Sequence, residues 1–534
     1  MDGPIIDIDR SSTAPLGAQL VDELRRRVLS GSLRPGDPVP STRALASAIG
    51  ISRSVVVAAY DQLAGEGYLD SRQGAVTRVA ELQPRTERAA DAAASGPGAT
   101  AARSDAPSGP AGPAEPRINL LPGRPSTSRI DTRSWRTAWR RAAALEIPAD
   151  SPPPFGVPQL RAEIADHLRH ARGLDCSPDD IVVTAGTSEA LGLLASVLGR
   201  RTGRAPALGR GTGHASVLGR GTGRAPALAI EDPGYPSARR LFERRGVRTH
   251  PIGVDGDGFD VDALRRLQLA PDAVMVTPSH QYPLGGRLPV ATRLELLAWA
   301  GAHDTLVIED DYDSEFRHLG PPLPALASLD RNGRVVLVGS LSKVLTPWIR
   351  LGYLVLPPTN HGLREAIRAS RDDEACPVPG IAQHAIAELL ASGAVRRHIA
   401  VARREYAHRR GLVLAALDGI RGAPLSGLDG GLHAVVELSD AAASAALVTR
   451  LEGEGVAVAP LSDYSAASGP GRSGIVFGYA APSDTQLVEG LALIRGALLD
   501  RLDPPARRVD ASARNPAGNT TKVDLSTTRP HPVG

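Results

Sequence analysis

Lysine is almost missing from this sequence of 534 residues. Of the 61 basic residues only Lys343 and Lys522 are lysines, and all the others are arginines. Cysteine is equally rare, and Cys176 and Cys376 show neither a disulfide-like nor a metal-like spacing. Such cysteine usage is typical of a reducing compartment, and no metal site is predicted.

Long apolar runs and a strong charge imbalance are missing as well. No run of about 18 apolar residues exists to span a bilayer, and the acidic first residues lack the apolar segment of a signal peptide, so a cytoplasmic protein is expected. The net charge of +3 gives no argument for nucleic-acid binding by the chain as a whole. Aromatic residues make up only 3%, but a hydrophobic content of 42% is enough for a sizeable core, and the length predicts two or three domains.

Three low-complexity segments divide the chain. Residues 81–116 are rich in Ala, Pro, Gly and Ser and predict a flexible linker. Residues 501–534 predict a disordered tail. Residues 199–228 repeat a ten-residue Gly- and Arg-rich unit, which we interpret as a surface insert, with a nucleic-acid contact as the alternative. The remaining parts are an N-terminal module at 13–80 and a larger domain at 117–500.

The larger domain has the pattern of an α/β protein. Short β-rich runs alternate with amphipathic stretches, which predicts a mostly parallel sheet. The runs are IVVTAG, PALAIEDPGY, AVMVTPSH, TLVIEDDYD and RVVLVGSLSK. After about residue 380 long helical stretches and a few strands predict a small α+β C-terminal lobe.

The N-terminal module has the pattern of a winged helix-turn-helix. A helical stretch begins at Leu16, and Ser41 and Ser52 can cap two further helices joined by a Gly-containing turn. Residues 68–80 can form two strands around a glycine. Eight Arg against six Asp and Glu in residues 13–80 give only a weak basic surface, so a helical docking domain is the alternative.

Lys343 lies in the apolar segment GSLSKVLTPWIRLGY. Arginine can replace lysine in ion pairs and phosphate contacts, but not where a neutral primary amine must condense with an aldehyde. The alternative is an ordinary surface lysine, so the neighbouring motifs must decide.

Those motifs suit an aldehyde cofactor that carries a phosphate. A helix that begins after Gly186 could bind the phosphate through its free N–H groups. A carboxylate at a strand end, Asp310 or Asp311, could hold the proton of a ring nitrogen, and Arg350 could add a phosphate contact. Each motif is ordinary by itself, but their joint order favours a cofactor site.

The sequence also resembles two known families. The stretch SGSLRPGDPVPSTRALASAIGISRSVVVAAYDQLAGEGYLDSRQG resembles the winged helix-turn-helix of the GntR regulators. The stretches PFGVPQLRAEIADHLRHARG, VVTAGTSEAL, IEDPGYPSARRLF, VTPSHQYPLG, IEDDYDSEFRHLGPPLPAL and SLSKVLTPWIRLGYLVLP resemble fold-type-I aminotransferases, which use pyridoxal 5′-phosphate. Together, over roughly residues 13–495, the chain most resembles the MocR subfamily of the GntR regulators.

This resemblance implies roles for particular residues. It implies that Lys343 binds pyridoxal 5′-phosphate as a Schiff base, with Asp310 on the ring nitrogen, Tyr312 on the ring hydroxyl and Tyr235 stacked on the ring. It implies phosphate contacts from Gly186, Thr187, Ser188, Ser340, Ser342 and Arg350, and it puts Tyr282 beside the cofactor. In the N-terminal module it implies that Arg43, Ser52, Arg53 and the wing residue Gly74 face DNA.

Three positions depart from the aminotransferase pattern. Ser151 stands where a tyrosine usually reaches the phosphate in the partner subunit. Trp348 replaces a glycine and is expected to crowd the pocket. Val476 stands where an arginine usually binds the substrate carboxylate, with Arg472 as the nearest candidate, so weak or no transaminase turnover is expected.

The sequence therefore predicts a pyridoxal-phosphate-dependent, DNA-binding transcription regulator of MocR type. It would sense pyridoxal phosphate itself or an amine or amino acid through Lys343. The resemblance implies a head-to-tail homodimer with each DNA-binding head on the partner's large domain. The alternatives are an active aminotransferase with a vestigial DNA-binding module and a protein that binds DNA but not the cofactor.

Overall fold

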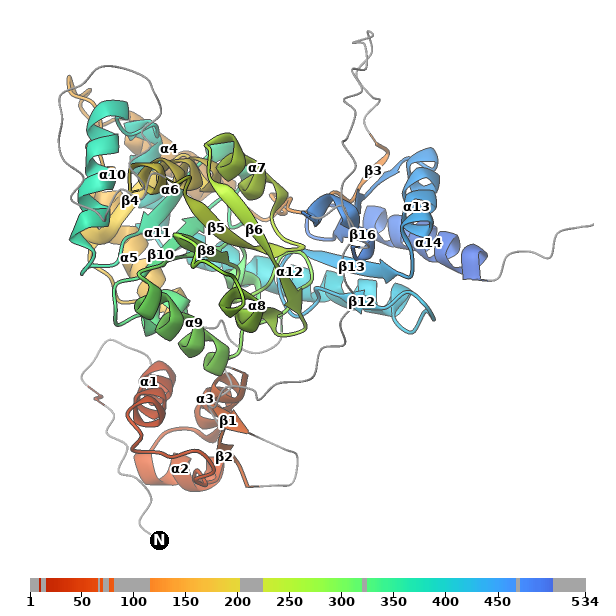
Figure 1. Cartoon of the computed structure of the whole chain (residues 1–534), viewed down its shortest axis with the longest axis horizontal. Coiled ribbons are helices and arrows are strands. Elements are labelled where there is room, and N and C mark those ends of the chain that lie inside the picture. The colour runs from red at the N-terminus through yellow and green to blue at the C-terminus, as the bar shows by residue number, and fades with distance from the viewer. Residues whose placement is uncertain are drawn as a thin grey trace, which may run out of the picture.

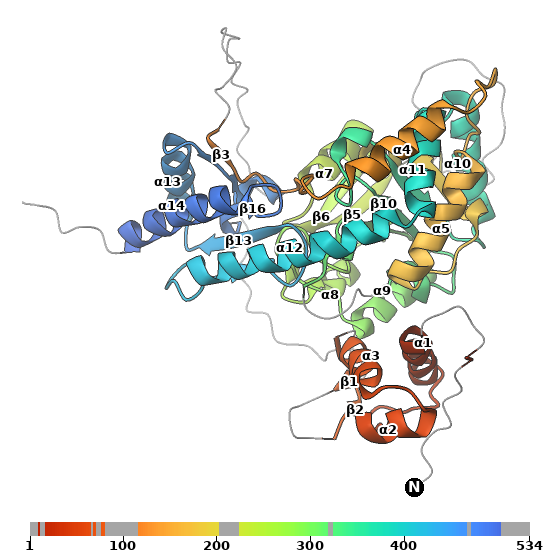
Figure 2. The same ribbon diagram turned by 180° about the vertical axis from the view of Figure 1, so that it is seen from behind.

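The computed structural model describes residues 9–10, 16–65, 68–70, 76–80, 116–201, 224–318, 324–466 and 471–502. Gly74, nearly all of the predicted linker and tail, and residues 202–223 of the predicted repeat insert lie outside these residues. The described residues form an N-terminal head, a large α/β domain and a smaller C-terminal lobe (Figures 1 and 2). Among their helices, none has the length and apolar character that crossing a membrane requires.

The head is a winged helix-turn-helix, as predicted. It consists of α1 (Leu16–Leu29), α2 (Thr42–Ile49), α3 (Arg53–Gly65) and the antiparallel strands β1 (Leu69–Asp70) and β2 (Arg78–Val79). Ser41 caps α2, because the Ala44 N–H donates to its Oγ at 3.2 Å. Gly50 ends α2 in the left-handed conformation with φ 66°, which a residue with a side chain rarely adopts, and so allows the tight turn into α3.

The large domain is built on an eight-stranded sheet of order β4-β11-β10-β9-β8-β5-β6-β7. The pairs between neighbours from β10 to β6 are parallel, whereas β11 lies antiparallel between β10 and β4, and β7 lies antiparallel to β6. The strands are β4 (Ile181–Thr184), β5 (Ala227–Asp232), β6 (Arg248–Asp255), β7 (Gly258–Phe259), β8 (Ala273–Val276), β9 (Leu306–Asp311), β10 (Val335–Ser340) and β11 (Gly352–Val355). The mostly parallel sheet predicted from the sequence is therefore confirmed.

Helices cover both faces of this sheet because its central strands are apolar on both sides. Alternate residues of β10 show this, since Val336 packs toward α6 (Thr187–Arg201), α7 (Pro236–Arg244) and α10 (His361–Glu374), whereas Val335 packs toward α8 (Val261–Arg265) and α9 (Val290–His303). Three further helices, α4 (Thr132–Ala143), α5 (Pro158–Arg172) and α11 (Gly380–Ala391), complete the domain.

The C-terminal lobe packs helices on a four-stranded antiparallel sheet of order β12-β13-β16-β15. Its strands are β12 (Leu425–Ser426), β13 (His433–Leu438), β15 (Ala459–Pro460) and β16 (Ser473–Gly478), and its helices are α13 (Ala441–Gly453) and α14 (Asp484–Leu502). A separate parallel pair joins β14 (Val456–Ala457) to β3 (Ile118–Asn119), so the segment that follows the linker belongs to this lobe. The predicted small α+β lobe is confirmed.

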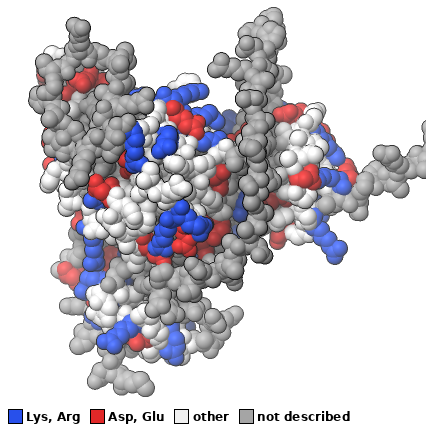
Figure 3. Space-filling model, in the orientation of Figure 1, with Lys and Arg blue, Asp and Glu red and all other residues white. Residues whose placement is uncertain are grey.

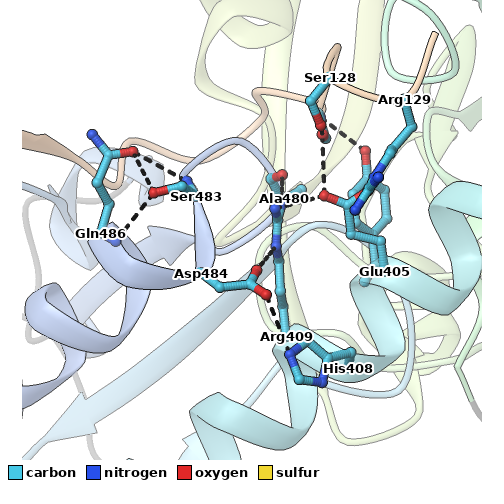
Figure 4. A network of polar contacts seen from close by, with 11 residues as sticks. Ser128, Arg129, Glu405, His408, Arg409, Ala480, Ser483, Asp484 and Gln486 are labelled. Atoms are coloured by element: carbon cyan, nitrogen blue, oxygen red, sulfur yellow. Dashed lines mark hydrogen bonds and ion pairs between the residues drawn. The ribbon is translucent and has the colours of Figure 1, made fainter.

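The long helix α12 (Ala394–Leu417) connects the large domain to the lobe (Figure 2). Arg409 is the centre of this connection, because its guanidinium contacts Glu405 at 2.6 Å, Asp484 at 2.9 Å and the Ala480 carbonyl (Figure 4). Glu405 in turn accepts from Arg129 at 3.3 Å. These ionic contacts, centred on the buried Arg409 and Glu405, hold α14 and the segment before α4 against α12.

The head lies against α9 of the same chain (Figures 1 and 2). Val290, in the first turn of α9, is only 4% exposed and belongs to the same apolar cluster as Leu20, Val21 and Leu24 of α1. Leu294 packs against this cluster one turn later. The head therefore packs on the large domain of its own chain.

Candidate functional site

A cavity of about 190 Å³ lies where β4, β9 and β10 end in the large domain. It is lined by every residue that the sequence proposed for the cofactor: Gly186, Thr187, Ser188, Tyr235, Tyr282, Asp310, Tyr312, Ser340, Ser342, Lys343 and Arg350. The carboxyl ends of parallel strands meet at one edge of a sheet, which is why motifs more than 150 residues apart in the sequence come together there. The cavity also contains Gly123, Thr277, Asp313, Pro347, Leu432 and His433.

Lys343 follows β10 and extends into this cavity, where its Nζ donates to the Gly123 carbonyl. Burial lowers the pKa of the Lys343 amine, although Asp313 and Asp310 act in the opposite direction. A lowered pKa increases the neutral fraction of the amine, which is the form that attacks a carbonyl carbon.

The structure distinguishes the two carboxylates, Asp310 and Asp311, between which the strand-end motif alone could not choose and of which the resemblance implies Asp310. Successive residues of β9 point to opposite faces of the sheet, and Asp310 lines the cavity. Asp311 points the other way and pairs with the buried Arg172, whose Nε lies 2.7 Å from its Oδ2. Asp311 is therefore occupied by a structural ion pair beneath the site.

Asp310 is poised to receive a cation. Its Oδ1 is buried and has no hydrogen-bond partner among the residues that the structure describes. Burial raises the pKa of Asp310 to about 7, and the nearby Asp311 and Glu231 add to this effect. A protonated ring nitrogen would supply both the missing hydrogen bond and the missing positive charge.

The opposite end of the cavity is built for an anion. The helix α6 begins at Thr187, so its first N–H groups and its positive dipole end face the cavity. Ser340 and Ser342 contribute hydroxyls, and Arg350 contributes the positive charge. Arg350 has φ 47°, an uncommon left-handed conformation for a residue with a long side chain, which is the kind of backbone strain found at binding sites.

Aromatic rings surround Tyr282 on one wall. Its ring centroid lies 5.3 Å from Tyr312, 5.0 Å from His433 and 5.4 Å from Tyr464. Tyr235 lies edge-on at 6.3 Å. His433 and Tyr464 belong to the C-terminal lobe, so this wall joins the lobe to the large domain.

Asp313 and His280 are site residues that the sequence analysis missed. The Nδ1 of His280 lies 2.9 Å from Asp313 Oδ2 and 2.8 Å from the Tyr312 hydroxyl. Burial would lower the pKa of His280, but the Asp313 carboxylate outweighs it and raises this pKa. Both residues lie in segments quoted for their strand ends, and the available signal was the position of a charged residue just beyond a strand that ends at the site.

The structure corrects the expectation for Trp348 and shows where Val476 and Arg472 lie. Trp348 is 92% exposed and does not line the cavity, so the prediction that it crowds the pocket is wrong; Pro347 lines the wall instead. Val476 is fully buried in an apolar cluster, and Arg472 pairs with Glu437 at 3.0 Å outside the cavity. Among the described lining residues, Lys343 and Arg350 are therefore the only cations.

The candidate DNA-contacting residues lie together in the head. Ser52 and Arg53 stand at the start of α3, and Arg43 lies in the first turn of α2; all three are exposed. On the face of the molecule drawn in Figure 3, basic side chains of the head lie beside acidic ones. Arg10, which the sequence analysis did not assign, donates to the Ile49 and Gly50 carbonyls and so braces the turn between α2 and α3.

Comparison with known proteins agrees with the division of the chain into a head and a larger C-terminal part. Residues 16–79 match the family of bacterial regulatory proteins named gntR, and residues 117–492 match aminotransferase class I and II. The chain is 40% identical over 484 residues to the HTH-type pyridoxine biosynthesis transcriptional regulator PdxR of Corynebacterium glutamicum, with 90% of this chain and 95% of that protein covered. It is 30% identical over 521 residues to the probable rhizopine catabolism regulatory protein MocR of Rhizobium meliloti, with 96% and 99% covered.

Solved structures give the same fold for the larger part. The α-aminoadipate aminotransferase LysN of Thermus thermophilus is 25% identical and superposes with a TM-score of 0.61, covering 72% of this chain and 93% of that one. That structure is a complex with a phosphopyridoxyl derivative of leucine. The fold-type-I architecture expected from the sequence is confirmed.

Proposed function

The chain belongs to the MocR-type transcription regulators of the GntR family, and on this basis we propose that it adjusts its promoter binding to pyridoxal 5′-phosphate held at Lys343. Members of the family join a GntR winged helix to an aminotransferase domain, and this chain has both parts. The observation that carries the proposal is the cavity that brings Lys343, Asp310 and the start of α6 together.

The residues present fit this cofactor. When bound, it supplies an aldehyde carbon that condenses with a primary amine. Lys343 would provide that amine, and the buried Oδ1 of Asp310, which has no hydrogen-bond partner among the described residues, would accept a hydrogen bond from the protonated ring nitrogen. The N–H groups at the start of α6, the hydroxyls of Ser340 and Ser342 and the guanidinium of Arg350 would hold the phosphate. Tyr235, Tyr282 and Tyr312 line the same cavity and would hold the ring.

We further propose that the signal is the cofactor itself rather than an amino acid. After the phosphate is assigned to Arg350, the described part of the cavity wall offers no cation for a substrate carboxylate. The remaining charged residue, Asp313, would repel one. The similarity to a protein named as a transcriptional regulator of pyridoxine biosynthesis supports the same proposal.

We propose DNA as the partner of the head because the head is a winged helix. We also propose that the chain forms a homodimer. Arg53 at the start of α3 and Arg43 in α2 would contact the operator, as such motifs place the start of the recognition helix in the major groove. Ile147 and Trp348 are each 92% exposed, which is unusual for large apolar side chains. A second copy of the chain would cover these two residues.

The proposal is tested by reduction with borohydride after incubation with pyridoxal phosphate. Lysine occurs at only two positions, so a peptide map distinguishes the site without ambiguity. We expect the label on Lys343, and the variant Lys522→Arg should be labelled to the same extent. The variant Lys343→Arg keeps the positive charge but should not be labelled, because guanidinium stays protonated.

The proposed effect of pyridoxal phosphate on DNA binding is tested by a titration with DNA. Binding to the chain's own upstream region should change when pyridoxal phosphate is added to the wild type, at fixed salt, and should not change for Lys343→Arg. A label on Lys522 alone would refute the cofactor site. An unchanged wild-type affinity for every DNA recovered in a genomic selection would refute the regulatory role.

A further inference from the structure

Asp313 lines the same cavity as Lys343, and neither the ring nitrogen nor the phosphate of the cofactor needs it. It lies two residues beyond the end of β9 and is only 2% exposed. Asp310 has the ring nitrogen as its proposed partner, and Asp311 is paired with Arg172. Among the described residues that line the cavity, Asp313 is therefore the carboxylate whose charge is left to explain.

His280 holds this carboxylate from the neighbouring strand. It lies in the loop that follows β8, is 5% exposed, and its Nδ1 lies 2.9 Å from Asp313 Oδ2. The same nitrogen lies 2.8 Å from the Tyr312 hydroxyl, so the two side chains that directly follow β9 share one partner. Burial lowers the pKa of His280, but the Asp313 charge outweighs burial and raises this pKa. The pair is therefore an imidazolium and a carboxylate.

The C-terminal lobe covers this pair through Gly431, which lies just before β13. Gly431 has φ 74°, and a Cβ atom there would collide with Asp313 Oδ2 and lie 2.7 Å from Cε1 of His280. Its N–H donates to the Phe316 carbonyl at 2.9 Å, which fixes the backbone at this close approach. A charge that is shielded from water in this way acts more strongly on its neighbours than a charge in solvent.

His433 of the same lobe does not compete for the carboxylate. Its ring centroid lies 5.5 Å from that of His280, and its Nε2 lies 2.8 Å from the Pro283 carbonyl. Burial and the His280 charge lower the pKa of His433 to about 4, so its ring is neutral near pH 7. The exposed Asp429, on the loop before β13, adds negative charge beside His280 from outside the cavity. His280 is therefore the histidine that pairs with Asp313.

Asp313 also acts on the reactive amine. Burial lowers the pKa of Lys343, and of the two carboxylates that oppose this effect Asp313 is the stronger and Asp310 the weaker. The motifs of the sequence point to Asp310 as the carboxylate of this site. In the folded chain, however, the carboxylate that acts most on the amine is Asp313.

From these contacts we propose that Asp313 is the counter-charge of the Lys343 nitrogen and that His280 is the positioning residue that holds it there. The role of Asp313 toward the free amine does not depend on the cofactor. Its role in the loaded protein rests on the proposed function, because only then does this nitrogen carry the cofactor. In both states the carboxylate favours the protonated nitrogen, while Asp310 is left available to the ring.

The role toward the free amine is tested by NMR on the full chain, without added cofactor or DNA, after its lysines are labelled with ¹³C at Cε. The chain has only two lysines, so Lys343 and Lys522 give two signals, and Lys343→Arg assigns them. A pH titration then gives the midpoint of each amine. We expect Asp313→Asn to lower the Lys343 midpoint by about 1–3 pH units, as for the loss of a nearby opposite charge, and to leave that of Lys522 unchanged.

Two more variants make this test decisive. Asp429→Asn removes a carboxylate near His280 but outside the cavity, and it should leave the Lys343 midpoint unchanged. Asp313→Ser has a smaller side chain that still accepts a hydrogen bond, and it replaces Asp313→Asn if that variant does not fold. A Lys343 midpoint that is the same in the wild type and in the folded Asp313 variant would overturn the counter-charge, and so would an equal shift in Asp429→Asn.

The positioning role of His280 is tested in two backgrounds. If His280 acts through Asp313, His280→Gln should shift the Lys343 midpoint when Asp313 is present and leave it unchanged in Asp313→Asn. A merely structural contribution would shift the midpoint alike in both backgrounds. Equal shifts in the two backgrounds, or no shift in either, would therefore overturn this role.

The loaded protein is tested by its absorption. The bound cofactor absorbs at different wavelengths with and without a proton on the Lys343 nitrogen, so a pH titration of the full chain with pyridoxal phosphate gives a second midpoint. We expect Asp313→Asn to lower this midpoint as well, again by about 1–3 pH units. Equal midpoints in a loaded wild type and a loaded Asp313→Asn would overturn the role in the loaded protein. A wild type without the cofactor's absorption band would instead refute the proposed cofactor site, while the lysine signals still decide the role toward the free amine.

Discussion

Replacing Asp310 with asparagine should stabilise the empty protein and weaken its binding of the cofactor. The amide group of asparagine has nearly the same size as the buried carboxyl group that it replaces. Without the cofactor, the buried Oδ1 of Asp310 has no hydrogen-bond partner among the described residues, so ionisation of this carboxyl group opposes folding. With the cofactor, the same carboxylate holds the proton of the ring nitrogen and stabilises the complex.

The size of the first effect follows from the pKa of Asp310, which rises from 3.8 to about 7 in the folded protein. Each unit corresponds to about 1.4 kcal/mol, so the free energy of unfolding changes by roughly 4 kcal/mol across this range. The folded state keeps the proton up to about pH 7, whereas the unfolded chain releases it near pH 4. The Asp310 contribution therefore lowers the stability of the cofactor-free protein progressively from about pH 4 to pH 7, and not above.

The assay is unfolding followed by tryptophan fluorescence at pH 5 and pH 8. All four tryptophans, Trp135, Trp139, Trp299 and Trp348, lie in the large domain, so the signal reports on that domain. At pH 8 the cofactor-free Asp310→Asn variant should be more stable than the wild type by up to about 4 kcal/mol, and at pH 5 the difference should shrink.

Loading with pyridoxal phosphate should narrow this difference in stability. A hydrogen bond to a charged group contributes about 1.5–3 kcal/mol, so the variant should bind the cofactor roughly 10- to 150-fold more weakly. The exposed Asp372→Asn on α10 serves as the control and should change neither quantity. A variant that is less stable than the wild type at pH 8 without cofactor, or that binds the cofactor equally well, would refute the reasoning.

Two further predictions concern DNA binding by the head and catalysis in the large domain. Arg53→Ala should weaken specific DNA binding by about 1–3 kcal/mol, as expected for the loss of an arginine that reads a guanine, and should leave the cofactor absorption unchanged; equal affinity of the two proteins in an anisotropy titration would exclude Arg53 from the readout. Transamination of α-amino acids with a keto acid should be slow or undetectable, because Val476 lies in an apolar cluster and the described cavity wall has no free cation for a carboxylate; rapid turnover in a coupled assay would restore the aminotransferase alternative.

Much of the cofactor site could be predicted because it depends on rules that are local in the sequence. Buried parallel strands appear as short apolar runs, and a polar residue at the end of each run must lie at the common edge of the sheet. This is why Asp310 and Lys343 could be placed in one site from their positions alone. The strand-end position alone did not choose between Asp310 and Asp311, because a shift of one residue along a strand exchanges its two faces. The family resemblance implied Asp310, and in the structure Asp310 is the one that lines the cavity.

Other features depend on side-chain direction or on distant packing and could not be predicted. Trp348 follows Pro347 in a short 3-10 turn that ends in the left-handed Arg350, and this turn directs the indole to solvent. Closeness to Lys343 in the sequence gave no information about that direction. Likewise, α9 is apolar on more than one side, so its sequence does not reveal that Val290 faces the head while Leu296 faces the sheet.

The pairing of β3 with β14 has a consequence for how the chain is made. Next to this pair, Arg117 donates to the Glu454 carbonyl, a hydrogen bond that spans 337 residues of sequence. At a synthesis rate of about 5–20 residues per second, β3 waits roughly 20–70 s for its partner strand to leave the ribosome. Ile118 and Leu120, which are almost completely buried in the finished lobe, have no β14 to pack against during this time. The head is fully synthesised long before then, so the nascent chain carries a complete DNA-binding module while its C-terminal lobe is still unfinished.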